Sequence, residues 1–413
     1  MHYYNKLKLL ALDSVISVTS AHPTNDRYYA DADSEACLNG KAVYVTSNTA
    51  HNSVVALPIA RNGSLLVNHA TSTATGGSGG NGINPRGMPA GPDELFGQGS
   101  ITVAGDYLFS VNAGSNTVTM LAIDKHDPTK LTVVGEPAVL PGEFPNTVGA
   151  SDKFNLVCVG LTGAKAGVSC ASYSWYGLGP FDELRPFDLN QTTPPHGPTN
   201  TVSHVFFSGD QETVFATVKG DPTVNNTGFL AAYPVENIHT SCYATPSVSY
   251  KGVMSSPNGT AVLFGSTPIP DTTNLFVTDA SFGATILGVD DYGKASTLYK
   301  TVIPGQDATC WVAICPATHT AFVTDIRVNR LVEMSLMNAE IIGEPIDLTT
   351  FNNDPGLTEI RSSGSFVYAL SPGNGTTEAW ITVLNALTKN PVQHANLRPL
   401  GLDRNAMGMA ILV

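Results

Sequence analysis

The residues best suited to chemistry in this chain are polar side chains in loops between short apolar runs. The candidate catalytic residues are His51, Asn112, Lys219, Asp325 and Arg327, which supply an imidazole, an amide, two cations and a carboxylate. Donors of this kind polarise a carbonyl oxygen, whereas a carboxylate or imidazole transfers protons. The candidate substrate-binding residues add amides, a hydroxyl and aromatic faces: Asn52, Phe144, Asn146, Thr147, His196, Gln306 and Trp311. Together they predict a mixed polar and aromatic site for a small molecule.

Each candidate also has a purely structural interpretation. Asn112 suits a turn, where its amide bonds the local backbone, as well as it suits a binding site. Asp325 and Arg327 would equally form a surface ion pair. His51 and His196 would equally be solvated loop histidines. Residue type and loop position therefore indicate these side chains as candidates, but they do not distinguish a functional role from a structural one.

Familiar catalytic motifs do not occur in the chain. There is no G-x-S-x-G elbow, H-E-x-x-H pair, P-loop or G-x-G-x-x-G between a strand and a helix. The glycine run TGGSGGNG from Thr75 is typical of a flexible loop, and no helical pattern follows that would cradle a phosphate. We expect no cofactor and no bound metal.

A repeated hairpin phrase must position these candidates. It opens as KAVYVTSNTAHNSVVALPI from Lys41 and recurs seven times, ending as FVYALSPGNGTTEAWITVL from Phe366. Each copy is an apolar strand, a polar turn and a second strand with alternating apolar residues. A repeat of roughly 50 to 60 residues that cannot bury both faces alone is typical of propeller blades. The sequence predicts an all-β, seven-bladed β-propeller with four-stranded antiparallel blades.

Further apolar runs supply the remaining strands. SITVAG from Ser100, SHVFFSG from Ser203 and CWVAICP from Cys310 are predicted innermost strands. Near Gly283 the count is ambiguous, because runs from Asn258 and Asn274 compete for one strand position, so six blades is the alternative. The C-terminal run MGMAILV from Met407 should pair with an N-terminal strand and close the ring. We expect one propeller domain over residues 41–413, with residues 1–40 contributing to ring closure.

The propeller model also places the candidates. In such folds the loops between second and third strands, and those leading into the innermost strands, surround the mouth of the central channel. His51, Asn112, Lys219 and Asp325 fall on loops of the first kind. Loops of the second kind carry the substrate-binding candidates other than Asn52, and also Phe96, Gln98, Glu359 and Arg361.

Composition excludes some partners. The net charge is −13, with only 21 Lys and Arg residues spread thinly, so no basic stripe is available for nucleic acid. No run of about 18 apolar residues is present, so no membrane span is expected. The oligomeric state is left open.

Cysteines and glycosylation motifs favour the secretory pathway or secretion. The six cysteines form no C-x-x-C pair, which favours disulfides, and local bridges are expected between Cys158 and Cys170 and between Cys310 and Cys315. Buried free thiols are the alternative. N-x-S/T sequons occur at Asn62, Asn190, Asn225, Asn258 and Asn374.

Several phrases resemble a known family. LVCVGLTGAKAGVSC from Leu156, LNQTTPPHGP from Leu189, TVFATVKGDP from Thr213 and IPGQDATCWVAICPATHTAFVTD from Ile303 are similar to secreted fungal propellers of the carboxymuconate-cyclase-like or lactonase-like type. Within that group the chain resembles the hetero-Diels-Alderases of fungal tropolone sesquiterpenoid biosynthesis.

The narrower resemblance implies a cyclase of secondary metabolism. Such enzymes form a tropolone quinone methide by dehydration and guide its [4+2] addition to a humulene-type sesquiterpene. The partners would be a tropolone precursor and an apolar terpene. A lactonase or carboxymuconate-cyclase-type enzyme is the alternative, although a tricarboxylate substrate would need more converging cations than these loops carry. A non-catalytic secreted glycoprotein that binds apolar ligands is the second alternative.

Overall fold

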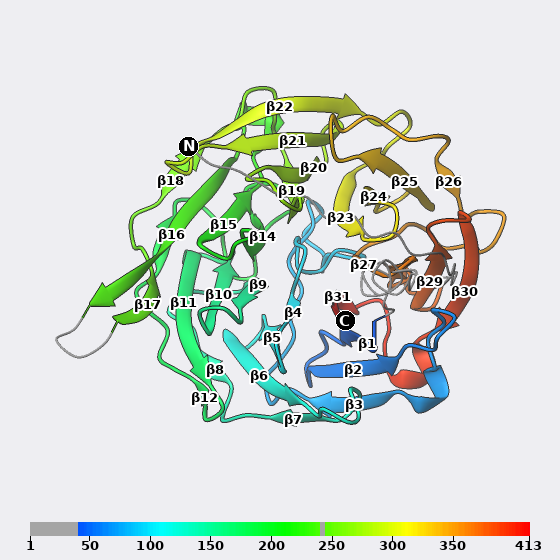
Figure 1. Ribbon diagram of the computed structural model, residues 1–413, viewed down its shortest axis with the longest axis horizontal. Helices are drawn as coiled ribbons and strands as arrows, with labels where there is room; N and C mark the ends of the chain where they lie inside the picture. Colours follow the sequence, from blue (N-terminus) through cyan, green and yellow to red (C-terminus); the bar gives the residue numbers. More distant parts are fainter. Residues whose placement is uncertain (1–39, 240–243) are drawn as a thin grey trace, which may run out of the picture. The chain divides into compact units, whose positions relative to one another are not determined.

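The computed structural model describes residues 40–239 and 244–413, and these belong to one compact unit, Cys37–Val413 (Figure 1). They form seven antiparallel sheets of four or five strands. Regular helix in the described part is limited to the 3-10 turns η1 (Val67–His69), η2 (Pro222–Val224) and η3 (Arg398–Leu400). The all-β, seven-bladed propeller predicted from the hairpin phrase is confirmed.

The blades, written from the innermost strand outward, have the following strands. Blade 1 contains β31 (Met407–Leu412), β1 (Ala42–Thr46), β2 (Ser53–Pro58) and β3 (Thr71–Ala74); blade 2 contains β4 (Ile101–Ala104), β5 (Tyr107–Asn112), β6 (Thr117–Ile123), β7 (Leu131–Val133) and β8 (Ala138–Val139); blade 3 contains β9 (Pro145–Ser151), β10 (Leu156–Leu161), β11 (Ala166–Ser174), β12 (Gly177–Leu178) and β13 (Arg185–Phe187). Blade 4 contains β14 (Val202–Phe207), β15 (Thr213–Val218), β16 (Phe229–His239), β17 (Ala244–Val248) and β18 (Val253–Ser255); blade 5 contains β19 (Leu263–Pro268), β20 (Leu275–Asp279), β21 (Gly283–Val289) and β22 (Ala295–Val302). Blade 6 contains β23 (Thr309–Cys315), β24 (Thr320–Asp325), β25 (Arg330–Ser335) and β26 (Ile346–Asp347); blade 7 contains β27 (Ile360–Ser363), β28 (Phe366–Ser371), β29 (Trp380–Asn385) and β30 (Asn390–Asn396).

The ambiguous fifth blade is resolved by these strands. The run near Asn258 forms β19 and the run from Asn274 forms β20, and both pair in register in the same sheet. They are successive strands rather than competitors for one position, so the six-blade alternative is wrong.

The ring closes through its C-terminal strand. β31 pairs antiparallel with β1, with Tyr44 opposite Ala410, and so provides the innermost strand of blade 1. β31 also contacts β4 and β27 of the neighbouring blades. The predicted pairing of MGMAILV with an N-terminal strand is confirmed. The predicted contribution of residues 1–40 falls almost wholly outside the described residues.

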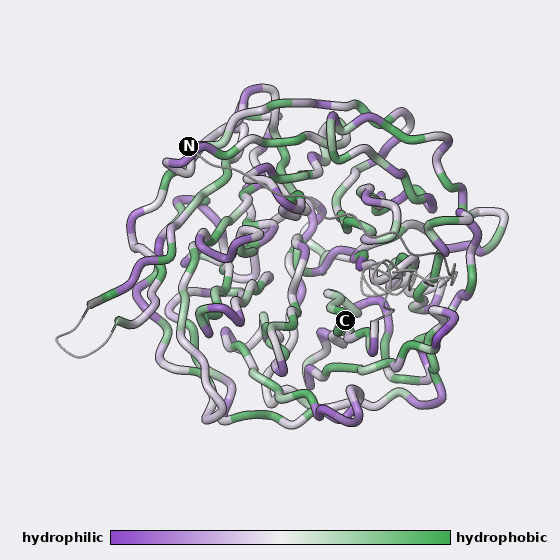
Figure 2. Tube along the Cα trace, viewed as in Figure 1, coloured by the Kyte–Doolittle hydropathy of each residue, from purple (hydrophilic) through white to green (hydrophobic). Residues whose placement is uncertain are grey.

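Apolar side chains are buried between blades. Seven clusters join neighbouring blades, for example Tyr44 of blade 1 with Leu108 of blade 2, and Phe276 of blade 5 with Val323 of blade 6. Figure 2 shows the corresponding alternation of hydrophobic and hydrophilic stretches along the strands and turns. A single blade has no core of its own, so the repeat is stable only as a ring.

The two predicted local disulfides have different outcomes. Cys158 and Cys170 face each other on β10 and β11 and are bonded, as predicted. Cys310 and Cys315 are free buried thiols, so the second prediction is wrong. Both lie on the single strand β23, where a separation of five residues corresponds to about 16 Å, far beyond the reach of a disulfide. Cys37 and Cys242 lie outside the described residues.

The five sequons all carry an exposed asparagine in a loop or turn: Asn62, Asn190, Asn225, Asn258 and Asn374. This geometry is compatible with glycosylation, which stays a prediction.

Candidate functional site

The central channel is occupied by the chain itself. The segment 95–100, which we call the channel segment, leads into β4 and crosses the middle of the ring (Figure 1). Its backbone bonds to the innermost strands of two blades, since Gln98 N donates to Ser203 O at 2.8 Å and Val148 N donates to Gly99 O at 2.8 Å. Trp311 of a third blade donates from Nε1 to Gly97 O at 3.3 Å. This six-residue loop thus ties together innermost strands that are far apart in sequence.

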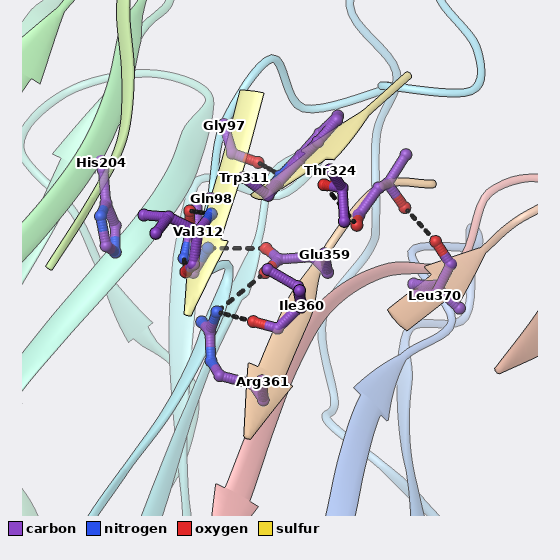
Figure 3. A network of polar contacts seen from close by, with 12 residues as sticks. Gly97, Gln98, His204, Trp311, Val312, Thr324, Glu359, Ile360, Arg361 and Leu370 are labelled. Atoms are coloured by element: carbon purple, nitrogen blue, oxygen red, sulfur yellow. Dashed lines mark hydrogen bonds and ion pairs between the residues drawn. The ribbon is translucent and has the colours of Figure 1, made fainter. Parts of the chain in front are cut away.

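Gln98 extends this pattern through its side chain. Its Nε2 donates to Val312 O at 3.0 Å, and its Oε1 accepts from Val312 N at 3.2 Å. The amide therefore acts as a short strand partner for β23, as Figure 3 shows. Since Gln98 is buried, the loss of either bond would leave an unpaired polar group in the interior.

The glycine run before the channel segment is closely packed rather than loose. A Cβ on Gly79 would lie 2.2 Å from the carbonyl carbon of Asn48, and one on Gly82 would lie 2.2 Å from Phe96. Asn48 also exchanges hydrogen bonds with Gly80 in both directions. These glycines permit close backbone approach, so the loop prediction holds but its flexible character does not.

Asn52 and Asn112 lie together, and their side chains form hydrogen bonds that join blades 1 and 2. Asn52 Nδ2 donates to Asn112 Oδ1 at 3.0 Å and to Val111 O at 3.1 Å. Asn112 Nδ2 donates to Thr117 and Thr119 within its own blade. Both side chains are buried and joined to each other across blades 1 and 2. In this structure the polar atoms of both amides form hydrogen bonds with other residues of the chain.

Four predicted substrate-binding residues hold the channel segment. Asn146 Nδ2 donates to Leu95 O at 3.0 Å, and Thr147 Oγ1 donates to Gln98 O at 2.7 Å. Phe144 packs on Leu95, and Trp311 lies edge-on to Phe264 with ring centroids 5.0 Å apart. All four are buried. The structure brings these four residues together around the channel segment. Their role in substrate binding stays a prediction.

Lys219 is a buried cation among the predicted catalytic residues. It is 1% exposed, its Nζ donates to Phe96 O, and it lies 4.3 Å from the centroid of the Phe264 ring. Burial lowers the pKa of Lys219 and raises the pKa of Asp93, and the two charges oppose these shifts. The neighbouring Glu94 is also buried, with both carboxyl oxygens unbonded to protein, and burial holds its pKa well above the usual range. Lys219, Asp93 and Glu94 are thus three buried ionisable groups near the start of the channel segment, which Asp93 and Glu94 directly precede.

The remaining predicted residues lie apart from this cluster. Asp325 Oδ2 accepts from Asp307 N at 2.8 Å and from Ala308 N at 3.1 Å, which fixes the loop before β23. Arg327 forms an exposed ion pair with Asp307 at 3.4 Å. Gln306 Nε2 donates to Ala280 O at 3.1 Å in the same region.

His51 and His196 are exposed on separate loops. Any catalytic role for these histidines, and for the other predicted residues, stays a prediction.

A pocket of about 240 Å³ opens on the other side of the channel segment. Its polar lining includes His204 of β14 and Arg361 of β27, and its walls include Ile101, Phe206 and Phe207. None of the sequence-predicted catalytic or substrate-binding residues lines it.

Strand register explains this separation. Val202 lies opposite Val218, whereas Phe207 lies opposite Val214. The pocket reaches from His204 to Gly209 and therefore lies toward the end of β14 that is far from Lys219. Lys219 and the pocket therefore lie toward opposite ends of the channel.

His204 is a neutral hydrogen-bond donor in this pocket. Burial, reinforced by the charge of Arg361, lowers the pKa of His204 to about 3. Its Nδ1 accepts from Ser266 N at 3.3 Å, which assigns the ring proton to Nε2. Nε2 faces Gly99, because a Cβ on that glycine would lie 3.0 Å from it. Nε2–H therefore lies against Gly99, and both residues line the pocket.

Arg361 supplies the second donor. Its side chain is 20% exposed, and Nη1 donates to Glu359 Oε2 at 3.2 Å and to Ile360 O at 2.8 Å (Figure 3). Glu359 is fully buried, and its Oε1 accepts from Gly99 N at 2.7 Å. Burial, only partly offset by Arg361, raises the pKa of Glu359 to about 7. The carboxyl group orients the guanidinium and also anchors the channel segment.

The sequence offered a partial signal for this pocket. The sequence predicts Glu359 and Arg361 near a channel mouth, but no local pattern distinguishes them from the other loop residues as candidates for function. His204 lies in the run SHVFFSG, whose pattern predicts an innermost strand and no functional role. A histidine among Val and Phe residues is unusual in such a strand, and that was the available clue.

No group of three or more His, Cys, Asp or Glu side chains among the described residues is arranged to hold a metal ion. Within the same part of the chain, no helix is long and apolar enough to cross a membrane.

Comparison with known proteins establishes similarity of fold. No protein-family model matches the chain, and no curated protein matches it in sequence. The solved structures that resemble it include a periplasmic gluconolactonase from Pseudomonas aeruginosa, with a TM-score of 0.59, 12% identity and coverage of 90% of this chain and 99% of that one. A protein provisionally described as a 6-phosphogluconolactonase from Bacteroides uniformis has a TM-score of 0.57 at 12% identity, with the same coverage. A protein of unknown function from Desulfotomaculum acetoxidans has a TM-score of 0.58 at 10% identity, again with 90% and 99% covered. The chain thus shares its propeller fold with lactonase-like proteins.

Proposed function

We propose that this protein is an enzyme that binds a small carbonyl compound in the pocket lined by His204 and Arg361. The observation that carries the proposal is that two hydrogen-bond donors, Nε2–H of His204 and the guanidinium of Arg361, belong to residues that line one pocket of mixed polar and apolar character. Two fixed donors directed at one oxygen atom stabilise negative charge that develops on it.

The proposed reaction is a hetero-Diels-Alder cyclisation. The heterodiene oxygen of a tropolone quinone methide would accept hydrogen bonds from both donors, which makes the diene more electron-poor. Addition of an alkene then forms one carbon–carbon and one carbon–oxygen bond and releases nothing, so no nucleophile or base is needed at this step. Walls such as Ile101 and Phe206 would hold an apolar terpene in one orientation. The resemblance to fungal tropolone sesquiterpenoid cyclases supports this choice.

A lactonase is the second candidate. It is favoured by the fold shared with the gluconolactonase structures and by the positive charge of Arg361, which suits an anionic lactone. Hydrolysis also needs a base that activates water. His204 has a pKa of about 3, and both oxygens of Glu359 already accept hydrogen bonds. The pocket is therefore better suited to polarisation than to hydrolysis.

The deciding experiment uses the purified full-length protein. Incubation with a hydroxymethyl tropolone precursor and humulenol should give one cycloadduct stereoisomer, and glucono-lactone should not be hydrolysed above background. Arg361→Gln and His204→Ala should lose stereocontrol or rate, while the exposed controls Arg86→Gln and His126→Ala should match the wild type.

An unchanged product mixture together with lactone hydrolysis would show that the protein is a lactonase and not a cyclase. Tropolone binding without turnover of either substrate would indicate a non-catalytic binding protein.

We also propose passage through the secretory pathway. The Cys158–Cys170 disulfide and five exposed sequons support this. Expression in a eukaryotic host followed by endoglycosidase digestion should reduce the apparent mass. A protein that carries no glycan at any sequon would contradict the proposal.

A further inference from the structure

A second, larger cavity lies between blades 4 and 5. It has a volume of about 1490 Å³ and is lined by both blades, from Ser208 to Val253 on one side and from Pro268 to Gly293 on the other. Pockets for small ligands are usually about 300–1,000 Å³. We call this cavity the blade groove. Its size suits a segment of polymer better than a single small molecule.

The groove results from an irregular outer edge of blade 4. β16 is 11 residues long, and its first part pairs with β18 while its second part, from Val235 to His239, pairs with β17. The outer edge is therefore divided at Pro234, which lines the groove. Blades 1, 5, 6 and 7 each have a single outermost strand instead.

The floor and rim of the groove present apolar side chains. Phe215, Leu275 and Val289 contribute to its lining. Val253 and Tyr292, which also line it, are 37% and 85% exposed. Exposed apolar side chains that gather around one cavity are typical of an interaction site.

The charged side chains that line the groove are mostly negative. The groove contains the carboxylates of Asp210, Glu212, Asp271, Asp290 and Asp291, and one cation, Lys251. Asp210, Glu212 and Asp290 are engaged with Ser208, Lys153 and the backbone of the turn at Tyr292. Asp271 and Asp291 are exposed and bond to none of the described residues. Two carboxylates are thus available to a partner.

We propose that the blade groove binds an extended segment of a partner protein that presents basic and large apolar side chains. Lysine or arginine side chains would pair with Asp271 and Asp291, and apolar side chains would pack on Val253, Tyr292 and the floor. The volume fits a peptide, and the negative lining repels phosphate-bearing partners. The proposal is independent of the channel pocket and its chemistry.

The test measures peptide binding to the full-length protein by fluorescence anisotropy. The probe is a fluorescein-labelled peptide of alternating lysine and leucine, and the comparison is an equally long peptide of alternating glutamate and leucine. We expect saturable binding of the first peptide, none of the second, and weaker binding as salt increases.

Groove variants locate the site. Asp271→Asn combined with Asp291→Asn should weaken binding about threefold to tenfold, as expected for the loss of two exposed ion pairs. Val253→Arg, which adds bulk and positive charge, should abolish binding. The control pair Glu136→Gln and Asp188→Asn removes two exposed charges elsewhere and should have little effect. Equal weakening in the control pair, or equal binding of both peptides, would overturn the proposal.

Discussion

Glu359 Oε1 accepts a hydrogen bond from Gly99 N at 2.7 Å, so one carboxyl group of blade 7 anchors the segment that fills the channel. Its other oxygen accepts from Arg361 at 3.2 Å. The same side chain therefore stabilises the channel segment and orients the guanidinium at the pocket. Stability and function are coupled through this residue.

Glu359 should make stability depend on pH. Its pKa is raised from about 4.5 to about 7, so the folded protein binds more protons than the unfolded chain between these values. The contribution of Glu359 to the free energy of unfolding should fall by up to about 3 kcal/mol as pH rises from 4.5 to 7, and then level off. The pKa of His204 is lowered by burial, so that group contributes in the opposite direction, and the comparison with Glu359→Gln isolates the part due to Glu359. Denaturant unfolding at pH 5 and 7.5 measures the change. Glu359→Gln should flatten this slope, while exposed Glu340→Gln should keep it; identical slopes in all three proteins would exclude Glu359 as the cause.

Lys219 and Asp93 should be energetically coupled. Removal of one buried charge leaves the other uncompensated, so Lys219→Met and Asp93→Asn should each destabilise the protein by roughly 3–5 kcal/mol. The double variant should be less destabilised than the sum, by about 1–3 kcal/mol. A double-mutant cycle of unfolding free energies measures this coupling. Strict additivity would mean that the two charges act independently.

Gly99 should be required for an open pocket. It has φ 76°, and a Cβ at this position would lie 3.0 Å from His204 Nε2. Gly99→Ala should therefore lose stability through backbone strain and also block ligand access to the donor pair. Gly87 has a similar φ of 75° with no atom near its Cβ position, so Gly87→Ala provides the matched control for strain.

Both glycine variants should lose about 1 kcal/mol of unfolding free energy. Only Gly99→Ala should weaken binding of a tropolone, measured by calorimetry. Retained binding in that variant would place the ligand elsewhere.

The Cys158–Cys170 bridge should contribute about 3 kcal/mol, as expected for a short closed loop. Cys158→Ala with Cys170→Ala should lower the unfolding free energy by that amount. Mass spectrometry of the non-reduced protein should recover a linked peptide pair with these cysteines, and Cys310 and Cys315 should be alkylated once the chain is unfolded. A linked Cys310 or Cys315 would contradict the structure.

The blades were predictable because their signal is local. The alternation in β2, β6 or β29 is contained in one short segment, and the polar turn before it marks the hairpin. Blade 5 was ambiguous because β19 and β20 are both apolar runs, and a local pattern does not show whether two such runs compete for one position or pair with each other.

The site was less predictable because it depends on distant contacts. The loop or strand positions of Lys219, Asn146 and Trp311 predict them as site residues, and those positions do place them near the channel. The segment around Gln98 then occupies this end and takes up their hydrogen bonds. His204 and Arg361 are separated by more than 150 residues in sequence, and no local pattern links them.

By itself, the sequence determined the all-β propeller and its closure by the C-terminal strand, since these depend on the patterns of single strands and hairpins. It predicted seven blades with six as the alternative, and a Cys158–Cys170 bridge with buried free thiols as the alternative. Only the tertiary structure decided which end of the channel is filled and which side chains remain available. The physical reason is that most buried polar groups bond to a partner. The channel segment bonds to Asn146, Trp311 and Lys219 at one end of the channel, whereas His204 and Arg361 line a cavity at the other.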